Sequence, residues 1–216
     1  MTITFPRDLP LNGLLTGQST FEPVYQQTRA ITGGGSVNVA DLGPAMWQAD
    51  YATDVLTRAD FATWVAWLQS LRGGLRLFKG RPPFWKWPQA YPKGFAALTY
   101  SGSPFTGLGN LSVIGVSRDT ATINQLPNGF VLAAGDFFSI PVGTRNHLHR
   151  VIEGAVAASN ALTVTIEPTI RPGVSTGVPV RLEAAYCEMA LTEAPKIVRN
   201  ANKGGAISFT AMQVLI

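Results

Sequence analysis

The sequence contains a single cysteine, Cys187, among its 216 residues. One cysteine cannot form an internal disulfide framework and is too few for a cysteine-based metal site. Its neighbours are apolar, so we expect a buried thiol that acts as a small hydrophobic residue. The sequence also lacks a run of about 20 apolar residues, the length needed to cross a bilayer, and its N-terminal residues lack the regions of a signal peptide. We therefore expect no membrane partner and assembly in a cytoplasm.

Charged residues are also scarce, at 14% of the chain, and the formal net charge of +4 is spread without any basic run. The absence of a basic cluster gives no indication of sequence-specific nucleic-acid binding. A low charged fraction is typical of proteins with large buried interfaces, because charged residues are depleted at interface cores. The composition therefore favours a homo-oligomer.

The patterns of common active sites and cofactor sites are missing as well. The 13 acidic residues are scattered, without the paired carboxylates that glycosidic cleavage uses, and no nucleophile elbow, Walker loop or dinucleotide fingerprint occurs. His147 and His149 share one side of a predicted strand, but the nearest acid is Glu153, so we expect a structural or exposed pair. The sequence thus predicts no catalytic residue, no cofactor and no metal site, and a protein that is not an enzyme.

The strongest local signal that is present predicts a helix over residues 58–72. Thr57 is a suitable N-cap with Asp60 three residues on, and Gly73-Gly74 can adopt the left-handed conformation that ends a helix. One apolar stripe at helical spacing contains Phe61, Trp64, Val65 and Leu68. We expect this helix to bury its stripe on a sheet.

Most of the remaining chain reads as short strands. A β meander that should close into a small barrel or sandwich is predicted from segments 111–116, 120–126, 136–141, 148–153 and 162–168. The alternating segment 46–52 and the last apolar strand, 207–215, should belong to the helix-bearing part. We therefore predict a mainly β fold with one helix. Residues 1–98 and 186–216 form a β-sandwich domain that carries the helix, and residues 99–185 form an inserted outer β-barrel domain.

Two stretches have no regular pattern. Residues 1–35 are rich in turn formers and predict an irregular arm with room for one short strand, and Gly33–Gly35 predicts a flexible loop. Residues 82–95 combine four prolines with a dense aromatic group: Phe84, Trp85, Trp87, Tyr91 and Phe95. These rings could form a stacking platform for sugars or nucleic acid. The favoured interpretation is that they plug the end of a core or a subunit interface.

Three features together resemble the distal tail family of long-tailed, siphovirus-like bacteriophages and related gene transfer agents. The first is an extended N-terminus, a strand with Trp47 and Tyr51, and a helix that ends in LQSLRGGLRLFKGRPP. The second is the segment 135–174, GDFFSIPVGTRNHLHRVIEGAVAASNALTVTIEPTIRPGV, which is similar to a β-module of phage tail-tip proteins. The third is the C-terminal return strand. The resemblance covers most of residues 40–216, but residues 82–95 have no counterpart in it.

This resemblance implies a virion structural protein of the tail tip, assembled in the host bacterial cytoplasm. Members of the family form a hexameric ring that connects the tail tube protein to the tail hub and fibre proteins. In some members the outer domain is related to carbohydrate-binding modules, so a contact with host-surface carbohydrate stays open. Two alternatives also stay open. One is a carbohydrate-binding module, expected if Trp85, Trp87 and Tyr91 are exposed and coplanar. The other is a tail-tube or terminator ring protein, which would stack as rings through a long inter-ring loop.

Overall fold

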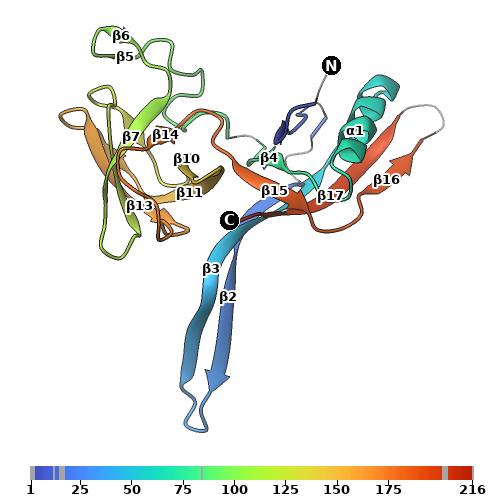
Figure 1. Ribbon diagram of the computed structural model, residues 1–216, viewed down its shortest axis with the longest axis horizontal. Coiled ribbons are helices and arrows are strands. Elements are labelled where there is room, and N and C mark those ends of the chain that lie inside the picture. Colours follow the sequence, from blue (N-terminus) through green and yellow to red (C-terminus); the bar gives the residue numbers. More distant parts are fainter. Residues whose placement is uncertain (1–2, 12, 15–17, 84, 201–203, 216) are drawn as a thin grey trace.

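The computed structural model describes residues 3–11, 13–14, 18–83, 85–200 and 204–215. Figure 1 shows a sheet that carries one helix, a β-barrel beside it, and a two-stranded ribbon that projects away from both. The predicted mainly β fold with one helix is confirmed. Among the described residues, no helix combines the length and the apolar character that a membrane span requires.

The helix-bearing sheet has seven strands in the order β1-β4-β15-β17-β3-β2, and β16 pairs with β17 beside this path. The pair β1 and β4 is parallel, and the other pairs are antiparallel. The sequence predicted that the C-terminal strand joins the helix-bearing part, and in the structure this strand, β17, pairs with β3. The strands are β1 (Arg7–Asp8), β2 (Thr20–Ile31), β3 (Val37–Ala52), β4 (Phe78–Gly80), β15 (Cys187–Leu191), β16 (Lys196–Arg199) and β17 (Gly205–Gln213).

The helix α1 (Arg58–Ser70) begins where the sequence predicted and ends two residues earlier. The N-cap Thr57 accepts a hydrogen bond from the Asp60 N–H at 3.2 Å. The helix ends because Leu71 is the C-cap, and the residues that follow it, Arg72, Gly73 and Gly74, all have positive φ.

Three of the four predicted inward residues of α1 are buried, namely Phe61, Trp64 and Leu68, whereas Val65 is half-buried. Trp67 is buried too, although the sequence analysis did not predict it. Its indole Nε1 donates to the Asp8 carbonyl at 2.9 Å.

The second body is a closed barrel in the order β10-β11-β13-β8-β7-β14, with antiparallel pairs throughout. Its strands are β7 (Leu108–Ile114), β8 (Thr120–Asn124), β10 (Phe137–Val142), β11 (Arg145–Glu153), β13 (Ala161–Glu167) and β14 (Pro179–Arg181). Two small pairs accompany it: β5 (Thr99–Tyr100) with β6 (Ser103–Pro104), and β9 (Val131–Leu132) with β12 (Ala155–Val156). The predicted domain boundaries, with the barrel domain at residues 99–185, stay a prediction. Phe95 lies before the first residue of that predicted domain but packs in the barrel core.

The barrel and the sheet meet where β11 contacts β2 and β3. The Trp47 indole Nε1 donates to the Leu148 carbonyl at 2.7 Å. The Arg150 guanidinium donates to both carboxylate oxygens of Glu22, at 2.8 and 3.1 Å, and lies over the ring of Trp47. Leu148 and Phe137 from the barrel belong to the same apolar core as the sheet residues. The two bodies therefore share one core at their junction.

The N-terminal region differs from the irregular segment that the sequence predicted for residues 1–35. Strand β2 has 12 residues, and the alternating segment predicted at 46–52 is the end of a longer strand of 16 residues, β3. The pairing register shifts between Val24 and Gln26 and again between Gln26 and Gln27. Such bulges interrupt the two-residue alternation by which strands are recognised in a sequence. The predicted loop at Gly33–Gly35 is confirmed as the turn between β2 and β3.

Candidate functional site

The most prominent feature of the surface is the projecting part of the β2–β3 ribbon, residues 24–45, which we call the arm. Strand β17 pairs with β3 only from Gln48 to Ala52, so no third strand among the described residues flanks the arm. At roughly 3.3 Å per residue, residues 24–31 span roughly 25 Å. Figure 1 shows the arm in blue, with its tip pointing away from both the sheet and the barrel. At its base, Tyr25 and Asp41 line a pocket together with barrel residues such as Glu167.

The arm exposes apolar side chains and carries little charge. Ile31 is 76% exposed and Leu42 is 70% exposed. Ile31 lies opposite Val37, so these two side chains share one face of the ribbon near its tip. The only charged residues between positions 24 and 45 are Arg29 and Asp41. The complete set of large exposed apolar residues on the arm is Val24, Tyr25, Ile31, Val37, Val39 and Leu42.

Both long edges of the arm also carry backbone groups that no third strand pairs. An isolated two-stranded ribbon is marginally stable in water, and an open apolar edge is a template for pairing with another chain. Natural proteins protect such edges with lysines or a covering element, but the arm has no lysine. The arm is therefore suited to bind another protein by strand addition, in which main-chain hydrogen bonds provide the affinity.

The aromatic group of residues 82–95 divides between the two cores. Trp85 packs against the sheet core, with its ring centre 5.9 Å from that of Phe137. Tyr91 stacks on Phe130 in the barrel core at 4.7 Å, and its hydroxyl accepts a hydrogen bond from the Val131 N–H. The Trp87 ring meets Phe95 edge-on at 5.1 Å. Of the three half-buried rings that a sugar platform would need, Trp85 thus packs on the sheet core, whereas Trp87 and Tyr91 both contact Phe95 of the barrel core. Phe84 lies outside the described residues.

Asp136 ties this segment to the barrel, and the sequence analysis did not single it out. One carboxylate oxygen accepts from the Gln89 N–H at 2.8 Å and the other from the Ala133 N–H at 2.8 Å. Burial raises the pKa of Asp136. Because both oxygens accept backbone hydrogen bonds, we assign this acid a structural role.

His147 and His149 are a buried pair on β11, in keeping with the structural alternative that the sequence predicted. The ring Nδ1 of His149 lies 2.6 Å from the Pro168 carbonyl and therefore carries the proton. Burial lowers the pKa of both histidines to about 4, and for His147 the neighbouring His149 and Arg171 contribute. No group of three His, Cys, Asp or Glu side chains in the described part of the chain could hold a metal ion.

No family model and no curated protein matches this chain.

The arm is the feature with the clearest functional geometry, and the sequence did not predict it. A signal for it was present: Ile31 and Val37, two β-branched residues, flank the turn that contains the glycine triplet. Both bulges place their extra residue on β3 and so hid the alternation on that side of the turn. The exposure of the arm could not be read from the sequence, because a buried hairpin would carry the same apolar residues.

Proposed function

We propose that this chain is a structural, non-catalytic subunit of a ring at the distal tip of a phage-like tail, and that the arm joins neighbouring subunits. The observation that carries the proposal is the arm, with its two unpaired edges and six exposed apolar side chains. The resemblance of residues 40–216 to the distal tail family supplies the location and the hexameric state. In this role the ring connects the tail tube protein to the hub and fibre proteins.

A ring needs two different surfaces on each subunit, because its contacts run head to tail. The arm is one of these surfaces. For the second we propose the outer edge of β16, which pairs with no strand other than β17 in the described part of the chain and whose four residues are all exposed. Addition of an arm to this edge would continue the sheet from one subunit to the next. A stable contact of this kind buries more than about 1,000 Å².

A second candidate is a tail-tube or terminator ring protein, and the arm favours it as well. Stacked rings need a long element that reaches from one ring to the next, and the arm spans roughly 25 Å. The two candidates differ in what they assemble. A distal tail protein closes a single ring, whereas a tube protein forms stacks of many rings.

The experiment compares the mass of the wild-type chain in solution with that of an arm variant, Ile31→Asp combined with Val37→Asp. Both residues are exposed at the tip of the arm, so the core should be unaffected. Val116→Asp, at a fully exposed position in the turn between β7 and β8, is the matched control. We expect the arm variant to lose its oligomers while the control keeps them, and electron microscopy of the wild type to show single rings.

Tail rings can require a partner template, so the location is decided on the particle. Antibody labelling or a reconstruction should place the chain at the tail tip. A position in the capsid or along the tube would reject the distal tail assignment, and a position along the tube would support the second candidate. Incorporation of the arm variant at the wild-type level would show that the arm does not join the subunits.

A further inference from the structure

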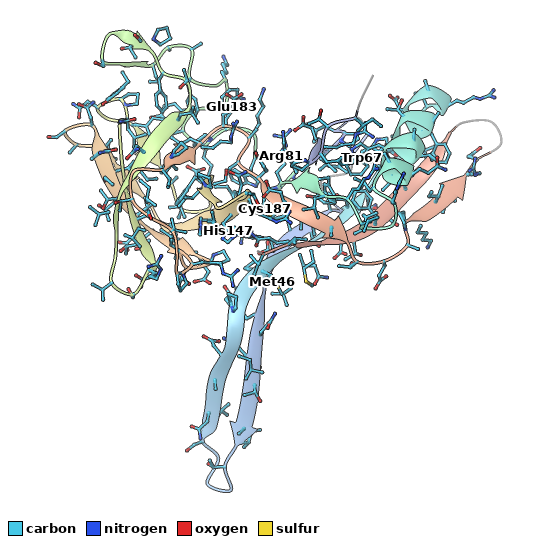
Figure 2. All side chains as sticks on the ribbon, viewed as in Figure 1. Met46, Trp67, Arg81, His147, Glu183 and Cys187 are labelled. Atoms are coloured by element: carbon cyan, nitrogen blue, oxygen red, sulfur yellow. The ribbon has the colours of Figure 1, made fainter. Side chains whose placement is uncertain are left out.

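A cavity of about 180 Å³ lies where the barrel strand β14 leads back to the sheet. Its lining comes from three distant parts of the chain: the start of the sheet at Asp8, the end of β4 at Lys79 and Arg81, and the segment from Arg181 to Tyr186. Figure 2 shows Arg81 at this junction, between the helix-bearing sheet and the barrel. We call this cavity the basic cavity, because three of its lining residues are cations.

The positive charge in the basic cavity is only partly balanced. The Lys79 ammonium lies 3.0 Å from the Asp8 carboxylate. The nearby Glu183 is paired with Lys86, at 3.6 Å. No ion pair in the described part of the chain includes either of the two arginines that line the cavity. Three cations and one carboxylate, that of Asp8, line the cavity, which leaves two positive charges in excess, although Asp8 and Glu183 are near enough to act on Arg81 electrostatically.

Arg81 has a donor that no described residue satisfies. Its Nη1 is buried and has no hydrogen-bond acceptor in the described part of the chain. The backbone at Arg81 is held in place, because the Tyr51 hydroxyl donates to its carbonyl at 2.9 Å and accepts from its N–H at 3.1 Å. Burial lowers the pKa of Arg81. A buried charged donor without an acceptor costs free energy that a bound anion would restore.

The other two cations gather around one aromatic ring. The Arg181 guanidinium carbon lies 5.8 Å from the centre of the Tyr186 ring, and the Lys79 nitrogen lies 5.4 Å from it. The ring is fixed, because the Tyr186 hydroxyl accepts a hydrogen bond from the Asn146 side chain at 3.0 Å. The Glu188 carboxylate on β15 accepts hydrogen bonds from the backbone N–H and the side-chain amide of Asn146. The cations are thus held close together without a nearby free acid.

We propose that the basic cavity is a binding site for a small oxyanion of the phosphate class, either free phosphate or the terminal group of a phosphate ester. Two guanidinium groups offer planar pairs of donors that match the oxygens of a phosphate. The two unbalanced charges match those of a phosphate dianion. None of its lining residues belongs to the arm or to β16, so the site does not overlap the two surfaces that we propose for ring formation.

The test is calorimetric titration of the full-length chain with inorganic phosphate, at constant ionic strength adjusted with chloride. We expect saturable binding at a single site. Arg81→Gln and Arg181→Gln should each weaken binding by about tenfold or more, because a hydrogen bond to a charged group contributes roughly 1.5–3 kcal/mol. Arg72→Gln, an exposed arginine just beyond α1, is the matched control and should bind like the wild type. A parallel titration with glycerol phosphate distinguishes the sources, since tighter binding of the ester indicates a phosphate ester as the ligand and tighter binding of inorganic phosphate indicates the free anion.

Thermal unfolding of each variant shows whether it is folded. Arg181 is exposed, so its substitution should leave the fold intact and decides the result if Arg81→Gln is unstable. The proposal is overturned if the wild type does not bind phosphate at millimolar concentration, or if Arg181→Gln binds it as tightly as Arg72→Gln does. Because the titration does not depend on oligomeric state, its failure would leave the proposed ring function untouched.

Discussion

Replacement of Trp47 by phenylalanine tests whether the sheet and the barrel act as one body. Trp47 is fully buried on β3, and its indole donates to the Leu148 carbonyl on β11 at 2.7 Å. Its ring centre lies 5.1 Å from that of Phe21 and 5.7 Å from that of Phe137. Phenylalanine keeps an aromatic ring in this position but removes the donor that joins the two bodies.

Two terms determine the size of the effect. Loss of the indole donor leaves the buried Leu148 carbonyl without this partner, which costs about 1–3 kcal/mol. The smaller ring removes apolar contact worth roughly 1–2 kcal/mol and leaves a gap in the shared core. We therefore expect the free energy of unfolding to fall by about 2–5 kcal/mol. With a urea dependence of about 2 kcal/mol per molar, the midpoint should fall by about 1–2.5 M.

Urea unfolding followed by circular dichroism measures this change. Trp67→Phe is the matched control, because it also loses an indole hydrogen bond, to the Asp8 carbonyl, but lies on α1 away from the barrel. Both variants should be destabilised. Of the two variants, only Trp47→Phe should separate the transition into two steps, since of the two indoles only that of Trp47 donates to a barrel strand. An unchanged midpoint for Trp47→Phe would refute the shared core at the junction.

Three further predictions follow from the same structure. Trp64→Ala should lower the free energy of unfolding by about 3–5 kcal/mol and leave little soluble protein, because it empties the core beneath α1. In the folded chain the pKa of His147 and of His149 is about 4, compared with the ordinary value of 6.5. Between pH 4 and pH 6.5 the unfolded chain therefore binds more protons than the folded chain does. Stability should therefore fall as the pH drops from 6.5 toward 4. Expressed alone, residues 86–185 should unfold at a higher temperature than residues 99–185, because only the longer piece contains Phe95 of the barrel core.

Each of these predictions has its own check. An unchanged melting temperature for Trp64→Ala would contradict the placement of this residue under the helix. His147→Phe should flatten the acid dependence of the urea midpoint, and an equally steep dependence would contradict the role of the histidine pair. Glu167 acts in the opposite direction at the acid end, because burial raises its pKa and the folded chain takes up that proton first. Equal melting temperatures of the two pieces would show that residues 86–98 do not belong to the barrel.

The features that the sequence predicted well are those that depend on local patterns. The start of α1, its N-cap and its buried stripe follow from the spacing of residues within one segment. The short strands of the barrel follow from alternation and turn residues, and the structure places strands at each of the five predicted segments between 111 and 168. Cys187 is buried, as its apolar neighbours indicated. In each case the residues that decide the outcome lie within a few positions of one another.

The tertiary structure decided the features that depend on residues far apart in the sequence. Whether the arm is exposed depends on where β17 stops pairing with β3, about 160 positions further along the chain. The aromatic segment 82–95 divides between two cores because it runs through the junction of the two bodies. The basic cavity brings Asp8, Arg81 and Arg181 together from three separate segments. No local pattern predicts such a convergence, because strand order and packing, rather than the spacing of residues along the chain, set the distances between these side chains.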